Sequence, residues 1–99
     1  MPQKYNLTPQ ALSDVQDIWH YIAEDNPVAA DRVESELYAA FAKLADNPYM
    51  GHMREDITGR SVRFWSVYSY QIIYRPDTSP LQVVRVLSGY RDLGDVLAE

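Results

Sequence analysis

Two strand-like runs in the second half of the chain constrain its fold more than any other feature. Residues 70–75 (YQIIYR) and 81–87 (LQVVRVL) are rich in β-branched and aromatic side chains, and the PDTSP segment between them has turn composition. Residues 62–65 form a shorter run of the same kind. Strands joined by such short segments pair most simply as an antiparallel meander, with turns at 66–69 and 76–80.

The first half of the chain predicts two helices whose ends are set by prolines. Thr8 and Pro9 are typical of an N-cap and a first helical position, and this helix should end near residues 25–27. A second helix should begin near Pro27 and end at Asn47-Pro48. The predicted apolar stripes are Ala11, Val15, Ile18, Trp19 and Ile22 in the first helix, and Ala30, Val33, Leu37, Ala40, Phe41 and Leu44 in the second. The fold class is therefore α+β: an N-terminal strand at residues 4–7, an antiparallel α-helical hairpin, then a three-stranded antiparallel meander completing a small sheet.

The alternation of side chains along a strand predicts which residues of the meander face the core. The expected core-facing set is Tyr70, Ile72, Tyr74, Val84 and Val86. The opposite set is Gln71, Ile73, Arg75, Val83, Arg85 and Leu87. An outward face that mixes apolar residues with arginine is unusual for a sheet that only contacts water, and it suggests a binding surface.

Length and composition exclude several classes of function. The 99 residues, 46% hydrophobic, suit a single domain spanning residues 1–99. The chain has no cysteine, and His20 and His52 lie far apart in sequence, so we expect no disulfide, no metal site and no cofactor. We expect a cytoplasmic protein without membrane contact, because no signal-peptide pattern and no apolar run of about 20 residues is present.

The net charge of −5 conceals an asymmetry between the two halves. Residues 1–50 contain Lys4, Arg32 and Lys43 against eight acidic side chains, whereas residues 60–91 contain five arginines against Asp77 alone. One interpretation is that a basic partner is drawn to the first half and an acidic partner to the second. The alternative is that the helix acids are a solvated face that the arginines balance.

An ordered series of motifs runs through nearly the whole chain. It comprises Ala11 with Asp14 and Asp17-Ile18, residues 21–27 (YIAEDNP) with Ala29-Ala30, Leu44 with Pro48 and Gly51, residues 70–75, residues 84–87 (VRVL) and Arg91-Asp92. Together with the order of predicted elements, this series resembles the RelE/ParE superfamily of small bacterial toxins, and within it the ParE branch.

The resemblance implies the toxin of a type II toxin–antitoxin system that takes part in plasmid stabilisation. ParE-like proteins inhibit DNA gyrase by binding and are not known for bond-making chemistry, so the resemblance implies a protein that is not an enzyme. It also implies a hetero-oligomer with a ParD-like antitoxin, whose C-terminal segment orders as it wraps the toxin. No direct nucleic-acid binding is expected.

Two sets of residues are candidates for these contacts. We predict that the target is bound by Arg75, Arg85, Tyr90 and Arg91. We predict that the antitoxin is bound by Tyr38, Trp65, Tyr68, Ile73 and Leu87. His20 and His52 are expected at the surface without a role.

Two alternatives remain open. A RelE-type toxin cuts messenger RNA on the ribosome, and here Arg75, Arg85 and Arg91 would stabilise charge while Tyr90 moved a proton. Against this, no lysine follows Lys43, Ser88 stands where relatives often have a histidine, and the isoelectric point of about 4.8 disfavours a polyanionic target. The other alternative is an attenuated toxin fold that serves mainly in antitoxin binding and autoregulation of its operon.

Overall fold

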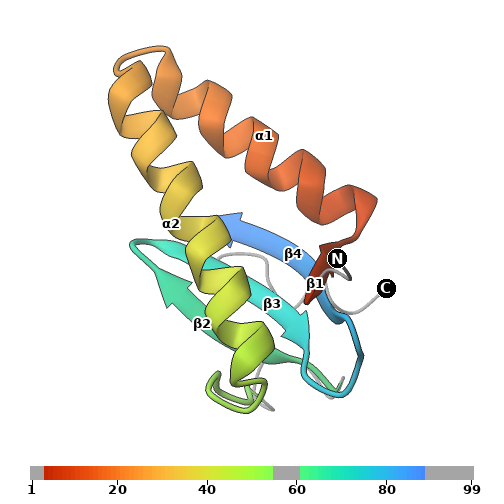
Figure 1. The fold of residues 1–99 in the computed structure, drawn as a ribbon. Helices are drawn as coiled ribbons and strands as arrows, with labels where there is room; N and C mark the ends of the chain where they lie inside the picture. The colour runs from red at the N-terminus through yellow and green to blue at the C-terminus, as the bar shows by residue number, and fades with distance from the viewer. Residues whose placement is uncertain (1–3, 55–60, 89–99) are drawn as a thin grey trace.

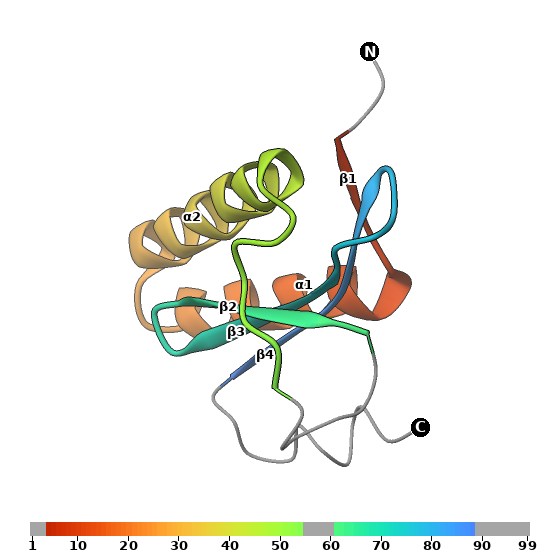
Figure 2. The same cartoon turned by 90° about the horizontal axis from the view of Figure 1, so that it is seen from below.

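A computed structural model of the protein describes residues 4–54 and 61–88, and the expected α+β architecture is observed in them (Figure 1). The elements are β1 (Tyr5–Leu7), α1 (Pro9–Ala23), α2 (Pro27–Asp46), β2 (Arg63–Val67), β3 (Tyr70–Arg75) and β4 (Leu81–Ser88). The two helices form an antiparallel hairpin, and α2 lies over one face of the sheet (Figure 2).

Both helices begin by the same local mechanism. The Thr8 side chain accepts a hydrogen bond from the backbone N–H of Ala11 at 3.1 Å, and the Asn26 side chain accepts one from Ala29 at 3.0 Å. A proline follows each cap, where its missing N–H is not needed. The predicted helix starts at Thr8-Pro9 and near Pro27 are confirmed.

The core between the helices and the sheet contains most of the predicted helical stripe. Phe41 is fully buried, together with Ala11, Val15, Leu37 and Leu44. Trp19 was predicted in the core but is only half-buried, because its indole Nε1 reaches Asp31 on α2 at 2.9 Å and joins the two helices there.

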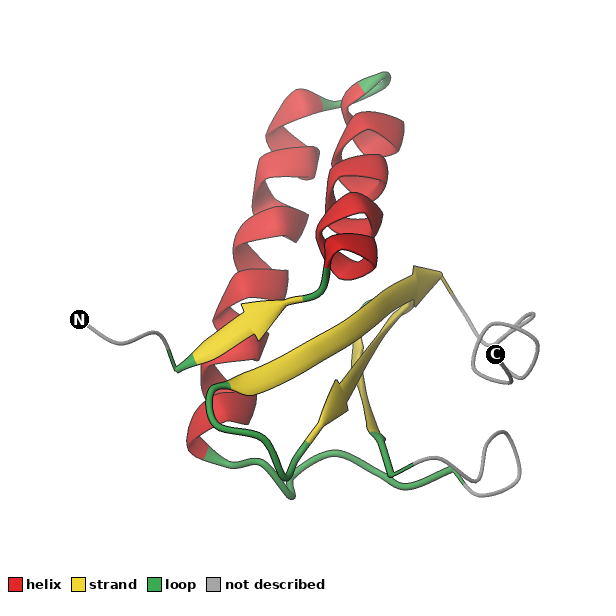
Figure 3. Ribbon diagram, turned by 90° about the vertical axis from the view of Figure 1, so that its right-hand side faces the viewer, coloured by secondary structure: helices red, strands yellow, loops and turns green. Residues whose placement is uncertain are grey.

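The sheet has the order β1-β4-β3-β2. The pairs β2–β3 and β3–β4 are antiparallel, as the meander predicted, and β1 runs parallel to β4 beside it (Figure 3). The strand β1 pairs only with residues 81–83, and Thr8, the N-cap of α1, and Asp14 of α1 supply the partners further along β4. Thr8 donates from its N–H to Val83 O at 3.0 Å and from its hydroxyl to Val84 O at 2.7 Å, and the Val86 N–H donates to the Asp14 carboxylate at 3.0 Å.

The predicted side-chain alternation along β4 is wrong at one point because the strand contains a β-bulge. Ile73 pairs with Arg85 and the next residue, Tyr74, pairs with Val83, so Val84 is an extra residue on β4. Val83 is consequently fully buried in the helix-side core, and Val84 packs on the opposite face of the sheet. These are the reverse of their predicted positions.

The prediction for the opposite face of the sheet was also wrong. This face was expected to present Gln71 and Ile73 outward, but Ile73 is fully buried with Val62 and Phe64 in a second apolar cluster, against which Leu87 packs. Gln71 is buried too, and its side-chain amide donates to Ser66 Oγ at 2.8 Å. The reason is that β3 is a central strand, flanked by β4 and β2, and it is buried on both faces.

Candidate functional site

The first candidate surface is an open groove at the β1 edge of the sheet. It is lined by Tyr5, Leu7, Leu12 and Tyr38, with Lys4 and Asn6 at its margin, and has a volume of about 470 Å³. Tyr5 and Tyr38 both contact the buried Phe41 ring edge to face, with centroids 5.6 and 5.3 Å away. The buried Phe41 ring therefore fixes the positions of both tyrosine rings, while Leu12 remains exposed at the surface.

The charged residue that lines the groove is Lys4, which is paired with Asp46 at 2.9 Å, whereas the helical hairpin beside the groove carries more acidic than basic side chains. Burial and the nearby Glu34 carboxylate raise the pKa of the Tyr38 phenol, so this side chain is a neutral hydrogen-bonding group at ordinary pH. The acids of the helical hairpin are Asp14, Asp17, Glu24, Asp25, Asp31, Glu34, Glu36 and Asp46. Tyr21 and Val28 lie exposed on the same hairpin and add apolar area to it.

The other predicted antitoxin residues lie in different environments. Trp65 is half-buried, with the Lys43 ammonium 5.7 Å from its ring and the His52 imidazole stacked at a centroid distance of 6.4 Å. Tyr68 is exposed in the β2–β3 turn with φ of 55°, a left-handed conformation that bulky residues rarely adopt. Its hydrogen bond to Glu36 of α2 raises the pKa of its phenol. Leu87 is half-buried, and Ile73 has no exposed surface.

The arginines predicted to bind the target have contrasting surroundings. Arg75 is exposed, with its Nε 3.9 Å from Asp77. Arg85 is half-buried against α1, where its Nε and a terminal nitrogen donate to the two oxygens of Asp14 at 2.7 and 3.0 Å. Tyr90 and Arg91 lie outside the described residues.

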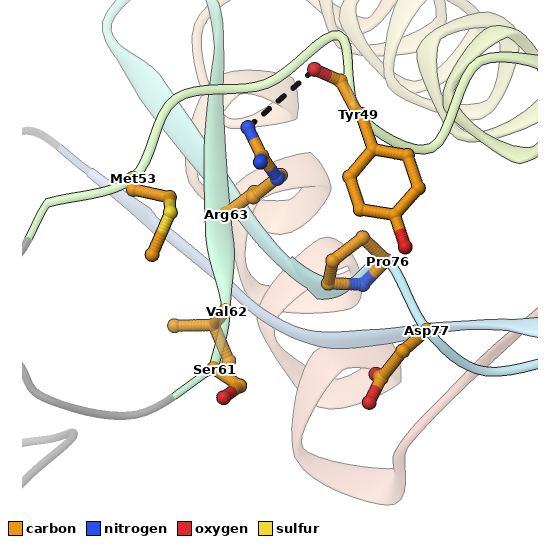
Figure 4. A pocket seen from close by; sticks show the side chains of 7 residues that line it. All are labelled: Tyr49, Met53, Ser61, Val62, Arg63, Pro76 and Asp77. Atoms are coloured by element: carbon orange, nitrogen blue, oxygen red, sulfur yellow. Dashed lines mark hydrogen bonds between the residues drawn. The ribbon is translucent and has the colours of Figure 1, made fainter.

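A second site, which sequence reasoning missed, lies at the β2 edge. It is a pocket of about 240 Å³ formed by the α2–β2 loop, the start of β2 and the β3–β4 turn (Figure 4). Tyr49 and Met53 are on opposite sides of the opening, and Val62, Arg63 and Asp77 complete much of its wall. The remaining lining residues are Ser61 and Pro76. In the sequence, Pro48 and Gly51 of this loop stand out only as members of the motif series, and nothing there indicates that the loop lines a pocket.

Buried hydrogen bonds hold this loop in one shape. The Tyr74 hydroxyl, fully buried, donates to Pro48 O at 2.7 Å and accepts from the Gly51 N–H at 2.9 Å. A Cβ on Gly51 would lie 2.5 Å from that hydroxyl oxygen, so the close approach requires glycine. Burial raises the pKa of the Tyr74 phenol, while the Gly51 hydrogen bond and Arg63 act in the opposite direction.

The described residues contain no group of acidic, histidine or cysteine side chains arranged to hold a metal ion. In the same part of the chain, neither helix has the length and apolar content needed to cross a bilayer. The side chains that line the two candidate surfaces are mainly aromatic and aliphatic, with an arginine in the β2-edge pocket. Surfaces of this composition suit the binding of other proteins.

Comparison with known proteins gives the family. Residues 5–93 match the sequence model of the ParE toxin of the type II toxin–antitoxin system parDE. Among solved structures, a chain of a chromosomal ParDE toxin–antitoxin system from P. aeruginosa superposes with a TM-score of 0.71 at 18% identity, over 87% of this chain and 95% of that chain. A search of curated proteins finds no match. Since the family match spans most of the sequence and the same fold is observed, this chain belongs to the ParE toxin family of type II toxin–antitoxin systems.

Proposed function

We propose that this ParE-family protein inhibits DNA gyrase by binding to it, and that a ParD-like antitoxin neutralises it. The observation that carries the proposal is the ParE toxin match over residues 5–93. Exposed aromatic and apolar side chains at both edges of the sheet support a function based on binding. Gyrase acts on the chromosome, so the proposed place of action is the cytoplasm.

For the antitoxin, we assign the groove at the β1 edge and the acidic hairpin beside it. An amphipathic antitoxin segment would place apolar side chains against Leu12 and Tyr38 and basic side chains near the helix acids. Tyr68, Trp65 and Leu87 remain candidates as the segment continues over the sheet. Ile73 is left out of the contact surface because its side chain is fully buried within the toxin.

The proposed action requires no bond-making chemistry. The Arg85 guanidinium is held by the Asp14 carboxylate, so its charge is locally neutralised rather than presented to a phosphate. This arrangement supports a positioning role for Arg85 in the fold and gives no support to the ribonuclease alternative.

A paired assay of the purified protein tests the proposal. We expect inhibition of gyrase supercoiling, or accumulation of gyrase cleavage complexes, with messenger RNA left intact on translating ribosomes. Addition of the protein encoded beside this chain in its operon should restore supercoiling. Cutting of messenger RNA with normal supercoiling would overturn the proposal, and antitoxin binding without gyrase inhibition or growth arrest would identify an attenuated toxin.

A further inference from the structure

The pocket at the β2 edge has the rigidity expected of a preformed binding site. Tyr74 fixes the α2–β2 loop through Pro48 and Gly51, and His52 and Phe64 exchange two backbone hydrogen bonds of 2.8 Å that fasten the end of the loop to β2. A loop held by buried bonds loses little conformational entropy when a partner binds to it.

Large side chains are exposed on this fixed loop. Tyr49 is 65% exposed and Met53 is 51% exposed, although both lie at the mouth of a pocket whose floor includes the buried Val62. Aromatic residues and methionine are enriched at protein interfaces, and an apolar depression bordered by them accommodates the side chain of a partner.

Arginine gives the pocket a charge that differs from that of the hairpin. The Arg63 guanidinium carbon lies 5.0 Å from the centre of the Tyr49 ring, and one terminal nitrogen donates to Gly51 O at 2.8 Å and to Tyr49 O at 3.5 Å. Among the described residues these bonds use a single nitrogen, so the guanidinium keeps donors on its other two for an incoming carboxylate. The carboxylate of the lining residue Asp77 lies 3.9 Å from the Nε of Arg75, which offsets its charge, so the Arg63 guanidinium is the charge left uncompensated among these three side chains.

We propose that this pocket is the anchor site for the target protein: it receives an apolar side chain from a segment whose neighbouring residues are acidic. The inference rests on the proposed function as a gyrase inhibitor and names the surface that carries it out. Charge complementarity selects the occupant, because the Arg63 guanidinium attracts a carboxylate-bearing segment, whereas the acidic hairpin attracts a basic one. The two surfaces also lie at opposite edges of the β1-β4-β3-β2 sheet.

The test compares pocket variants with a matched control in the full-length protein. Tyr49→Ala and Met53→Ala should each raise the concentration for half-inhibition of gyrase by about tenfold or more. Ser69→Ala is the control, since this residue is exposed in the β2–β3 turn and belongs to neither candidate surface, and it should change the value by less than about twofold. Thermal unfolding and antitoxin capture should be unchanged in the pocket variants.

A pair of charged variants tests the chemistry of the occupant. Both Met53→Asp and Met53→Lys remove the apolar side chain at the mouth of the pocket. Met53→Asp should weaken gyrase inhibition several-fold more than Met53→Lys, because the new carboxylate repels an acidic segment. An equal loss in the two variants would overturn the acidic assignment.

Other outcomes separate the inference from the proposed function. Wild-type inhibition of gyrase with unchanged inhibition by Tyr49→Ala and Met53→Ala would overturn the pocket alone, as would loss of antitoxin capture in these variants. Growth arrest by the wild type without gyrase inhibition would overturn the gyrase proposal, and the growth effect of the same variants would then decide the pocket. A wild-type protein that has neither effect would overturn both.

Discussion

Removing Arg85 should destabilise the folded protein, because its guanidinium connects α1 to β4. The Asp14 carboxylate accepts hydrogen bonds from two nitrogens of Arg85, at 2.7 and 3.0 Å, and from the Val86 N–H at 3.0 Å. The Arg85 and Asp14 side chains are 26% and 14% exposed. The pair therefore lies between an exposed ion pair, worth about 0–1 kcal/mol, and a buried one, whose disruption costs about 3–5 kcal/mol.

The two single substitutions should differ in size. We expect Arg85→Ala to lower the free energy of unfolding by about 1.5–3 kcal/mol. Asp14→Ala should cost about 1 kcal/mol more, because it also leaves the Val86 N–H without its acceptor. Urea unfolding of the two single variants and the double variant gives the coupling energy between Arg85 and Asp14, which we expect to be about 1–2 kcal/mol. The cycle subtracts what each side chain contributes through its other contacts.

Arg75→Ala is the matched control for this cycle. Its side chain is 47% exposed and its ion pair with Asp77 is 3.9 Å long, so the free energy of unfolding should change by less than about 0.5 kcal/mol. Additive losses in the Asp14/Arg85 cycle, or an Arg85→Ala protein as stable as the wild type, would refute this reasoning. A loss of toxicity in Arg85→Ala can be assigned to target binding only if the variant remains folded at the assay temperature.

Three further changes test the packing and caps that hold the fold together. Tyr74→Phe removes the hydroxyl that joins Pro48 and Gly51. This leaves the buried Gly51 N–H and the part-buried Pro48 carbonyl without their partner, which should cost about 2–4 kcal/mol in urea unfolding. The free energy of unfolding of the wild type should also fall as pH rises above 10.0. At that pKa Tyr74 ionises in the unfolded chain, while burial keeps the phenol protonated in the folded protein. Plotted against pH between about 9 and 11, the free energy of unfolding should therefore fall less steeply in Tyr74→Phe than in the wild type. Thr8→Ala loses both the α1 cap and the hydroxyl bond to Val84 O, so the melting temperature should drop by an amount corresponding to about 1–3 kcal/mol, and an unchanged melting temperature would contradict the double role of this residue.

The features predictable from sequence are those fixed by neighbouring residues. Thr8-Pro9 sets a helix start because a cap and the proline that follows it act within one turn. The β3 boundaries at Tyr70 and Arg75 follow from composition and from the turns beside them. Such signals require no knowledge of what the element packs against.

Features set by distant partners were not predictable in the same way. Nothing in the run LQVVRVL distinguishes Val84, the bulged residue, from Val83. Near the bulge the Thr8 hydroxyl donates to Val84 O, and the Asp14 carboxylate accepts from the Val86 N–H. Arg85 was predicted as an exposed contact residue because its partner is 71 positions away in the sequence. The β2-edge pocket likewise combines the α2–β2 loop, β2 and the β3–β4 turn, and only the folded chain brings these segments together.

On the proposed assignment of the β1-edge groove to the antitoxin and the β2-edge pocket to the target, the sheet order separates the two contacts. The groove is supported by Phe41 under Tyr5 and Tyr38, whereas the pocket is supported by Tyr74 under the α2–β2 loop. Phe41 and Tyr74 belong to the same buried cluster, so a core substitution disturbs both surfaces together, whereas an exposed side chain such as Met53 can be changed without affecting the opposite edge. Loss of one binding function with retention of the other is therefore informative only for surface variants. On the proposed assignment of the two surfaces, we expect that a single exposed substitution at the pocket abolishes target binding while antitoxin binding is kept.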